Sequence, residues 1–241
     1  MRIAFFSDIH ANLPALEAFF RDVEQRKVDA LYCLGDLVGY NIWPDEVIAE
    51  IRERGIPTIA GNHDLKVKKL KQDEHLEDVD YAYHIGSEQA REYLKTLPQF
   101  IKLQFTIAEE PIKVMLVHGS PRSINEYLLE ELSEQYLKEL LLESNADMLF
   151  CGHTHKPYHR LIPTSGKFKH VVNIGSVGKP KDGDPRGCYV ILTLKENSTL
   201  VDTQSIAVDF IRFEYDVEMA ARAIEASPLP DEFAERLRKA H

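Results

Sequence analysis

Five short groups of polar residues in this 241-residue sequence have the composition of metal ligands. Each combines histidine, aspartate or asparagine with a neighbouring glycine or a second ligand type, and each directly follows an apolar segment. The groups are Asp8-Ile9-His10, Gly35-Asp36, Gly61-Asn62-His63-Asp64, His118-Gly119 and Gly152-His153-Thr154-His155. Each group alone has an ordinary explanation as a turn, a helix cap or a satisfied histidine. Because five of the ten histidines fall in these groups, one shared site explains them better than five coincidences.

The mixture of ligand types indicates which metals and which chemistry to expect. Imidazole, carboxylate and amide oxygen together favour divalent ions such as Mn, Fe or Zn over Ca or thiolate-preferring metals. Two such ions about 3.5–4 Å apart activate a shared water and stabilise the attacking and departing oxygens of phosphoryl transfer. The chain has 29 Lys+Arg and 39 Asp+Glu, a net charge of −10, so phosphate needs a local positive charge of this kind. The pattern predicts a two-metal hydrolytic site with one bridging carboxylate.

The apolar segments before the groups predict strands that end at one edge of a sheet. Residues 3–6, 30–34 and 58–60 are short apolar runs typical of buried strands. Between the first two, apolar residues recur at helical spacing from Leu13 to Val23, with Asn12 as the expected N-cap. A second helix is expected from Pro44 to a point before Gly55. This β-α-β-α-β order predicts a mostly parallel sheet with its functional edge at the carboxyl ends of the strands.

The rest of the chain continues this alternation after an interruption. Residues 66–98 contain a lysine-rich run, an acidic stretch and a helix over residues 87–97, which together predict a helical insertion near the site edge. Further strands are expected at residues 100–106, 112–117, 148–150, 171–174, 189–194, 199–203 and 210–215. Helices are expected over residues 128–142 and from residue 217 onward. No repeat or linker interrupts residues 1–241, so we expect a single domain.

Taken in order, the five groups resemble the calcineurin-like metallophosphoesterase superfamily. The tail, with Asn173-Ile174-Gly175-Ser176 followed by Asp182-Gly183-Asp184-Pro185-Arg186, resembles the small, stand-alone prokaryotic branch of that superfamily. The resemblance implies an α/β fold, a four-layer α-β-β-α sandwich of two mixed sheets. It also implies a dimetal site at the carboxyl ends of the strands.

The resemblance also implies a role for each matching residue. One ion would be held by Asp8, His10 and His155, the other by Asn62, His118 and His153, with Asp36 bridging the two. His63 would lie outside the metal shell and act as general acid while a hydroxide bridging the metals attacks phosphorus in line, and Asp64 would orient His63. We expect two divalent ions, manganese first, with iron, zinc, nickel and magnesium as alternatives.

The expected activity is hydrolysis of a phosphate ester, as a phosphodiesterase or phosphatase acting on a small or nucleotide substrate. The Gly35-Asp36 group lacks the Asp-Arg that follows in the protein Ser/Thr phosphatase branch, which disfavours phosphoproteins. Because His63 is present, phosphomonoesters and nucleotide phosphoanhydrides are both kept as candidate substrates. Alternatives are a dinucleoside polyphosphate hydrolase, a nuclease and a non-catalytic metal-binding scaffold. The acidic charge argues against stable nucleic-acid binding.

Residues outside the five groups also have expected roles, in some cases with an alternative. Arg186 is the expected substrate-phosphate ligand, with a surface salt bridge as the alternative. Asn173 and Ser176 are expected to support the ligand loops. The aromatic residues Tyr81 and Tyr83, with His84, either stack on a base or pack in the interior.

Cysteine spacing and hydropathy address compartment and partners. Three cysteines without a C-x-x-C pair favour a reducing compartment, so we expect a cytoplasmic protein. No stretch of about 18 apolar residues predicts a membrane span. The expected partner is a small-molecule phosphate ester or nucleotide, and a homo-oligomer is left open.

Overall fold

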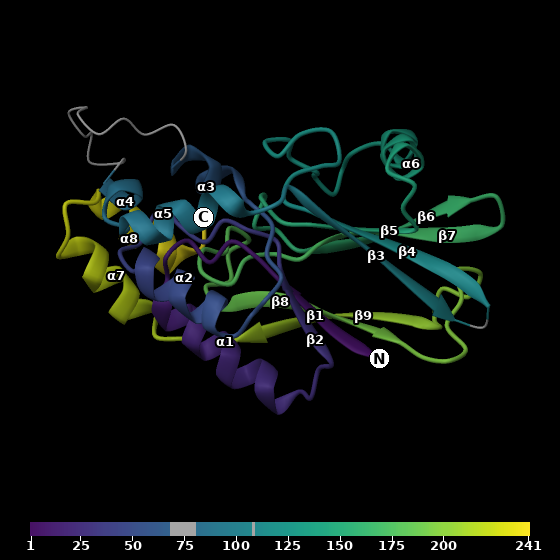
Figure 1. Cartoon of the computed structure of the whole chain (residues 1–241), viewed down its shortest axis with the longest axis horizontal. Helices are drawn as coiled ribbons and strands as arrows, with labels where there is room; N and C mark the ends of the chain where they lie inside the picture. The colour runs from purple at the N-terminus through teal and green to yellow at the C-terminus, as the bar shows by residue number, and fades with distance from the viewer. Residues whose placement is uncertain (68–80, 108) are drawn as a thin grey trace.

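Two mixed β-sheets lie face to face in the computed structural model, which describes residues 1–67, 81–107 and 109–241 (Figure 1). The first sheet has the order β2-β1-β8-β9, formed by β1 (Arg2–Phe6), β2 (Ala30–Cys33), β8 (Gly187–Leu194) and β9 (Ile206–Phe213). The second has the order β3-β4-β5-β7-β6, formed by β3 (Phe100–Ile107), β4 (Glu110–Val117), β5 (Met148–Cys151), β6 (Tyr158–Thr164) and β7 (Lys167–Asn173).

Three pairs of neighbouring strands are parallel. Strand β1 pairs in parallel with β2, and β5 pairs in parallel with β4 and β7. The other neighbours, including β8 beside β1 and the β3–β4, β6–β7 and β8–β9 pairs, are antiparallel. The expectation of a mostly parallel sheet is therefore wrong, because strands joined by short connections, such as β3–β4 and β6–β7, pair antiparallel. The two mixed sheets implied by the family resemblance are confirmed.

Helices cover the outer faces of both sheets and close one end of the molecule (Figure 1). Helix α1 (Leu13–Gln25) begins where expected, since the Asn12 side chain accepts a hydrogen bond from the Ala15 N–H at 3.2 Å. Helix α6 (Glu134–Glu143) lies on the outer face of the second sheet. The remaining helices are α2 (Pro44–Glu53), α3 (Asn62–Lys66), α4 (Tyr81–His84), α5 (Glu88–Thr96), α7 (Val217–Glu225) and α8 (Asp231–Lys239).

Alternating side chains divide the core into layers. On β1, Ile3 and Phe5 point into the cluster between the sheets, whereas Ala4 and Phe6 pack against the α1 side. Phe5 meets Phe150 of β5 across the sheets with ring centroids 4.4 Å apart. The leucines of α6 pack on the opposite face of the second sheet. The order helix, sheet, sheet, helix confirms the expected four-layer sandwich.

Some sequence expectations differ from the structure for local reasons. Residues 128–133 are not helical: α6 begins only after Ser133, whose hydroxyl caps it, and Leu128 is buried in a loop held by the Tyr158 hydroxyl at 3.0 Å. Residues 199–203 form a turn, in which the Ser205 hydroxyl binds the Thr199 backbone, instead of a strand. Residues 58–60 make one isolated bridge with Cys33. The strand β6 was not expected.

The segment at residues 66–98 is described in part. Helices α4 and α5 belong to it, and α5 matches the helix expected over residues 87–97. Most of the lysine-rich run and the acidic stretch lie outside the described residues. In the described ranges, no helix is both long and apolar enough to cross a lipid bilayer.

Candidate metal centre

The predicted ligands meet where strands from both sheets end. Asp8 follows β1 and Asp36 follows β2 of the first sheet; His118 follows β4 and His153 follows β5 of the second. Asn62 begins helix α3 between them. Apart from the half-buried Asn62, these side chains are almost completely buried. The two-sheet architecture thus brings together ligands that are up to about 150 residues apart in the sequence.

Three groups of these side chains have ligand atoms within 4.8 Å of one another. They are Asp8, His10 and His155; Asp36, His118 and His153; and His10, Asp36 and His63. The groups share residues, so they form one continuous cluster. A buried His/Asp cluster of this composition is able to bind divalent metal ions.

One carboxylate oxygen lies near the middle of the cluster. Asp36 Oδ2 is 3.3 Å from His118 Nε2, 3.6 Å from His10 Nε2 and 4.0 Å from His63 Nε2. On one side, Asp8 Oδ1 is 3.1 Å from His155 Nε2. On the other, the Asn62 side-chain oxygen is 3.1 Å from His118 Nε2. Asp36 Oδ2 therefore lies between the two sides of the cluster.

Backbone carbonyls fix three of the imidazole rings. Nδ1 of His10 bonds to the Val38 carbonyl at 3.0 Å, and Nδ1 of His118 bonds to the Leu34 carbonyl at 2.8 Å. His155 is held in the same way by the Lys179 carbonyl. Because a carbonyl only accepts, each Nδ1 carries the proton and each Nε2 faces the cluster as a potential ligand.

Unpartnered buried atoms test whether the cluster fits a metal. Within the described residues, four buried side-chain polar atoms have no hydrogen-bond partner, and three of them belong to predicted ligands: Asp8 Oδ1, Asp36 Oδ2 and His153 Nε2. A buried carboxylate oxygen without a partner is strongly unfavourable. Cations between these atoms would satisfy all three, so the residues fit divalent ions.

Backbone strain is concentrated at the same residues. Asp8, His10, Asp36, His153 and His155 all have φ between 52° and 67°, in the left-handed region that residues with a Cβ rarely adopt. Each such residue costs about 1–3 kcal/mol and persists only where its surroundings hold it, often at functional sites. The sharp turns at the strand ends direct the ligand side chains inward.

Two of the motif glycines make room for the carboxylates. A Cβ on Gly61 would lie 2.0 Å from Asp36 Oδ1, and a Cβ on Gly152 would lie 2.5 Å from Asp8 Oδ2. These close approaches let the backbone N–H of His63 bind Asp36 Oδ1 at 2.8 Å. The glycines are therefore needed so that neighbouring loops can hold the ligand carboxylates.

Asp64 holds the loop around Asp36. Its two oxygens accept the backbone N–H groups of Asp36, Gly61, Leu37 and Val38 at 2.8 to 3.4 Å. Among the described residues, neither oxygen hydrogen-bonds to the His63 side chain. The contacts therefore tie the end of β2 to the start of α3, and the orientation of His63 depends on another residue.

That residue is Tyr83, from helix α4. Its hydroxyl is 2.5 Å from His63 Nδ1, and the two rings are stacked with centroids 5.7 Å apart. Lys66 Nζ donates to the same hydroxyl oxygen at 3.3 Å. Tyr83 is buried, as its packing alternative expects. Residue spacing could not predict the hydrogen bond to His63, because it does not place α4 beside α3.

The tail supports the cluster from behind. Asn173 Nδ2 donates to the Gly152 carbonyl at 2.6 Å and to the Thr154 hydroxyl at 3.0 Å, while the Ser176 hydroxyl donates to the Asp8 carbonyl at 2.8 Å. These bonds confirm the expected supporting role of both residues. Arg186 is exposed, and its guanidinium pairs with Asp184 at 2.7 Å. This contact is the surface salt bridge that was the alternative to phosphate binding.

Charge in the metal-free cluster is balanced by protons. Burial alone would raise the pKa values of Asp8 and Asp36, but the surrounding imidazoles hold both well below the usual range. Burial opposes protonation of His118, yet Asp36 and Asp8 outweigh it and raise the His118 pKa to about 10. The His118 ring is therefore protonated at neutral pH, and a metal ion has to displace that proton.

Metal affinity should consequently depend on pH. Because binding at His118 Nε2 releases one proton, the affinity for Mn²⁺ is expected to rise about tenfold per pH unit between about pH 6 and 8. Titration calorimetry in two buffers of different ionisation enthalpy counts the proton directly. A pH-independent affinity without proton release would contradict this assignment of charge.

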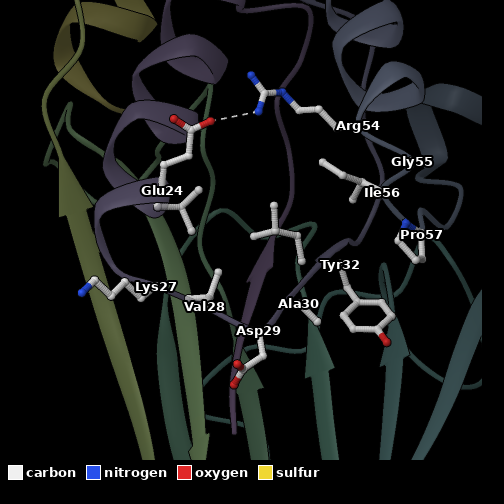
Figure 2. Close-up of a pocket in the computed structure, with 12 residues that line it drawn as sticks. Glu24, Lys27, Val28, Asp29, Ala30, Tyr32, Arg54, Gly55, Ile56 and Pro57 are labelled. Carbon is white, nitrogen blue, oxygen red and sulfur yellow. Dashed lines mark hydrogen bonds and ion pairs between the residues drawn. The ribbon is translucent and has the colours of Figure 1, made fainter.

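A separate cavity lies at the other end of the first sheet. It has a volume of about 440 Å³ and is lined by residues around the amino end of β2, with Glu24 and Arg54 paired at 3.0 Å across it (Figure 2). Asp36 follows the opposite end of β2. The cavity therefore contains none of the predicted ligands.

Comparisons with known proteins extend over nearly the whole chain. A model of the calcineurin-like phosphoesterase superfamily domain matches residues 1–197. The uncharacterized protein MJ0912 of Methanocaldococcus jannaschii is 31% identical, over 98% of this chain and 96% of that protein. A metallophosphoesterase from Sphaerobacter thermophilus is similar in structure, with a TM-score of 0.78 and 28% identity over 100% of this chain and 99% of that one. Hypothetical protein PH1004 from Pyrococcus horikoshii OT3 is also similar in structure, with a TM-score of 0.77 and 25% identity over 98% of this chain and 97% of that one.

Proposed function

The chain belongs to the calcineurin-like phosphoesterase superfamily, and from this premise we propose that it is a two-metal hydrolase of small or nucleotide phosphate esters. The observation that carries the proposal is the convergence of unpartnered, buried ligand atoms around Asp36. A structural role alone would not leave such atoms without partners. Similarity to a metallophosphoesterase over the full chain supports the same reaction class.

Each of the two ions has its own set of ligands in this proposal. Asp8, His10 and His155 would hold one ion, and Asn62, His118 and His153 the other, with Asp36 shared. Bound there, divalent ions would supply positive charge for the phosphoryl oxygens and lower the pKa of a water between them. We propose manganese as the resident metal, because the carboxylate and amide oxygens among the ligands suit it.

His63 is the proposed proton donor to the leaving oxygen. Burial lowers the pKa of His63 well below its ordinary value in the protein without substrate. We propose that the negative charge of a bound phosphate ester favours the imidazolium, which is the form that can donate a proton. In the imidazolium both ring nitrogens carry a proton: Nδ1 donates to the Tyr83 hydroxyl oxygen, and Nε2, the atom that faces Asp36 Oδ2, holds the proton for the leaving oxygen. Tyr83 is thus the positioning residue of the proposed acid, and Asp64 acts through the loop.

A substrate panel tests the proposed activity. Manganese-loaded protein should hydrolyse at least one class among phosphomonoesters, cyclic nucleotides and dinucleoside polyphosphates, and chelation should abolish the activity. Single-stranded DNA should be a poor substrate, because a chain of charge −10 repels long polyanions outside its metal site. Metal binding without hydrolysis of any class would favour the scaffold alternative, and preferential cleavage of DNA would favour a nuclease.

The cysteines support a cytoplasmic location for this hydrolase. Cys33, Cys151 and Cys188 are all unpaired and buried. Burial raises the pKa of the Cys151 thiol to about 12, so it is unreactive. Free thiols are typical of a reducing compartment.

A further inference from the structure

Tyr40, in the loop between β2 and α2, packs against the metal cluster. Its ring centroid is 4.8 Å from the ring centroids of both His10 and His63. The ring of Phe233 of α8 meets it edge-on at 5.1 Å, and the ammonium group of Lys179 lies 4.5 Å from its centroid. These contacts fix the Tyr40 ring beside a predicted metal ligand and the proposed acid.

The backbone at Tyr40 is strained where the loop approaches His63. Tyr40 has a φ of 67°, in the left-handed region that a bulky side chain rarely adopts. A Cβ on Gly39 would lie 2.8 Å from His63 Nδ1, and the Asn41 side-chain amide donates to the His10 carbonyl at 2.9 Å. Strain of this kind persists only where surrounding contacts hold it, and it is concentrated at functional sites. The loop is therefore tied to the cluster on both sides of Tyr40.

The hydroxyl group of Tyr40 is the part of the side chain that these contacts leave unused. Among the described residues, no atom forms a hydrogen bond with it, whereas the hydroxyls of the buried tyrosines Tyr83, Tyr158 and Tyr189 all have partners. The Tyr40 oxygen is also not one of the four buried atoms without a partner, and the residue is half-buried. The hydroxyl is therefore accessible to solvent and free to bind a ligand.

This hydroxyl carries a proton that a phosphate oxygen can accept. Burial raises the pKa of Tyr40, and the negative charge of Asp36 raises it further, so the hydroxyl stays protonated at neutral pH. Among charged groups, Asp36 has the largest effect on it, which agrees with a hydroxyl on the side of the cluster. A hydrogen bond to an anion is stronger than one to a neutral acceptor. A phosphate ester at the cluster is therefore a complementary ligand for this donor.

We propose that the Tyr40 hydroxyl donates a hydrogen bond to an oxygen of the phosphate ester bound at the metal cluster, beside the leaving oxygen that His63 protonates. Contact of one ring with both His10 and His63 places this donor next to the metal-binding and the proton-donating parts of the site. Tyr40 is then a catalytic residue that binds the substrate directly, in addition to the metal ligands. This inference rests on the proposed hydrolase function and adds a substrate-binding residue to it.

The variant Tyr40→Phe removes the hydroxyl and keeps the ring. In manganese-loaded protein, loss of a hydrogen bond to an anion should weaken binding of methylphosphonate, a stable analogue, about tenfold. It should also lower kcat/KM for p-nitrophenyl phosphate about ten- to a hundredfold. Manganese content and melting temperature should not change, because the ring contacts with His10 and His63 remain and no hydrogen bond within the described residues is lost. Titration calorimetry measures the dissociation constants.

Tyr32→Phe is the matched control. Tyr32 lines the separate cavity at the other end of the first sheet (Figure 2), and its hydroxyl also lacks a partner among the described residues, so this variant should change neither measurement.

Unchanged methylphosphonate affinity in Tyr40→Phe, or no binding of methylphosphonate by the wild type, would overturn the proposed contact. Unfolding or loss of manganese in Tyr40→Phe would overturn it as well, because either result would give the hydroxyl a structural role. Hydrolysis of p-nitrophenyl phosphate by the wild type separates the two claims. Hydrolysis with unchanged affinity in Tyr40→Phe rejects only the Tyr40 contact, and weakened affinity without any hydrolysis by the wild type rejects only the proposed function.

Discussion

Asp36→Asn is expected to remove most of the activity and at least one of two bound metal ions. The substitution keeps the size of the side chain and one oxygen for the His63 N–H, but it removes the charge that two ions would share. Loss of several kcal/mol of charge stabilisation at the reacting phosphoryl group corresponds to a rate lower by about a thousandfold. Metal content and turnover should be measured on the same samples.

Asp209→Asn is the matched control for this charge removal. Asp209 lies on β9 and is exposed, so the same chemical change there should leave metal content and turnover unchanged. Full metal content together with wild-type turnover in Asp36→Asn would contradict the shared-ligand role.

His63→Ala should retain metal but lose activity in proportion to how poor the leaving group is. A positioned general acid contributes about 10²–10⁴-fold where the departing oxygen needs a proton. We therefore expect at least about a hundredfold loss on an alkyl phosphate ester and less than about tenfold on a p-nitrophenyl ester. Rates over a series of leaving groups at saturating manganese provide the test.

A second histidine variant distinguishes loss of proton donation from a general loss of activity caused by a destabilised fold. His159 on β6 bonds to His170 at 3.0 Å and belongs to none of the three groups in the cluster. His159→Ala should lower the rates of all esters equally, if it lowers them at all. An undiminished rate on the alkyl ester in His63→Ala would reject His63 as the acid.

The cluster could be predicted from the sequence because its determinants are local. Apart from Asn62, each ligand closely follows an apolar strand, and parallel strands such as β1 and β2 end at the same edge. Glycines such as Gly61 and Gly152 mark the close approaches that the loops need. Family, fold class and the meeting of the ligands were predictable for this reason.

Contacts between distant segments could not be predicted in the same way. Tyr83 bonds to His63 only because α4 packs against α3, and Lys179 lies over Tyr40 only because the loop after β7 returns to the cluster. Likewise, the apolar spacing through Leu128 fits a helix, but packing of the loop on Tyr158 decides the local structure. These features depend on tertiary structure that residue spacing does not specify.

The central claim is that the buried His/Asp cluster is a two-metal centre joined by Asp36. Anomalous diffraction from crystals of manganese-loaded protein tests it most directly. The account predicts two anomalous peaks in the cluster, about 3.5–4 Å apart, with the Asp36 carboxylate bound to both. A single peak, or two peaks that do not share Asp36, would contradict it.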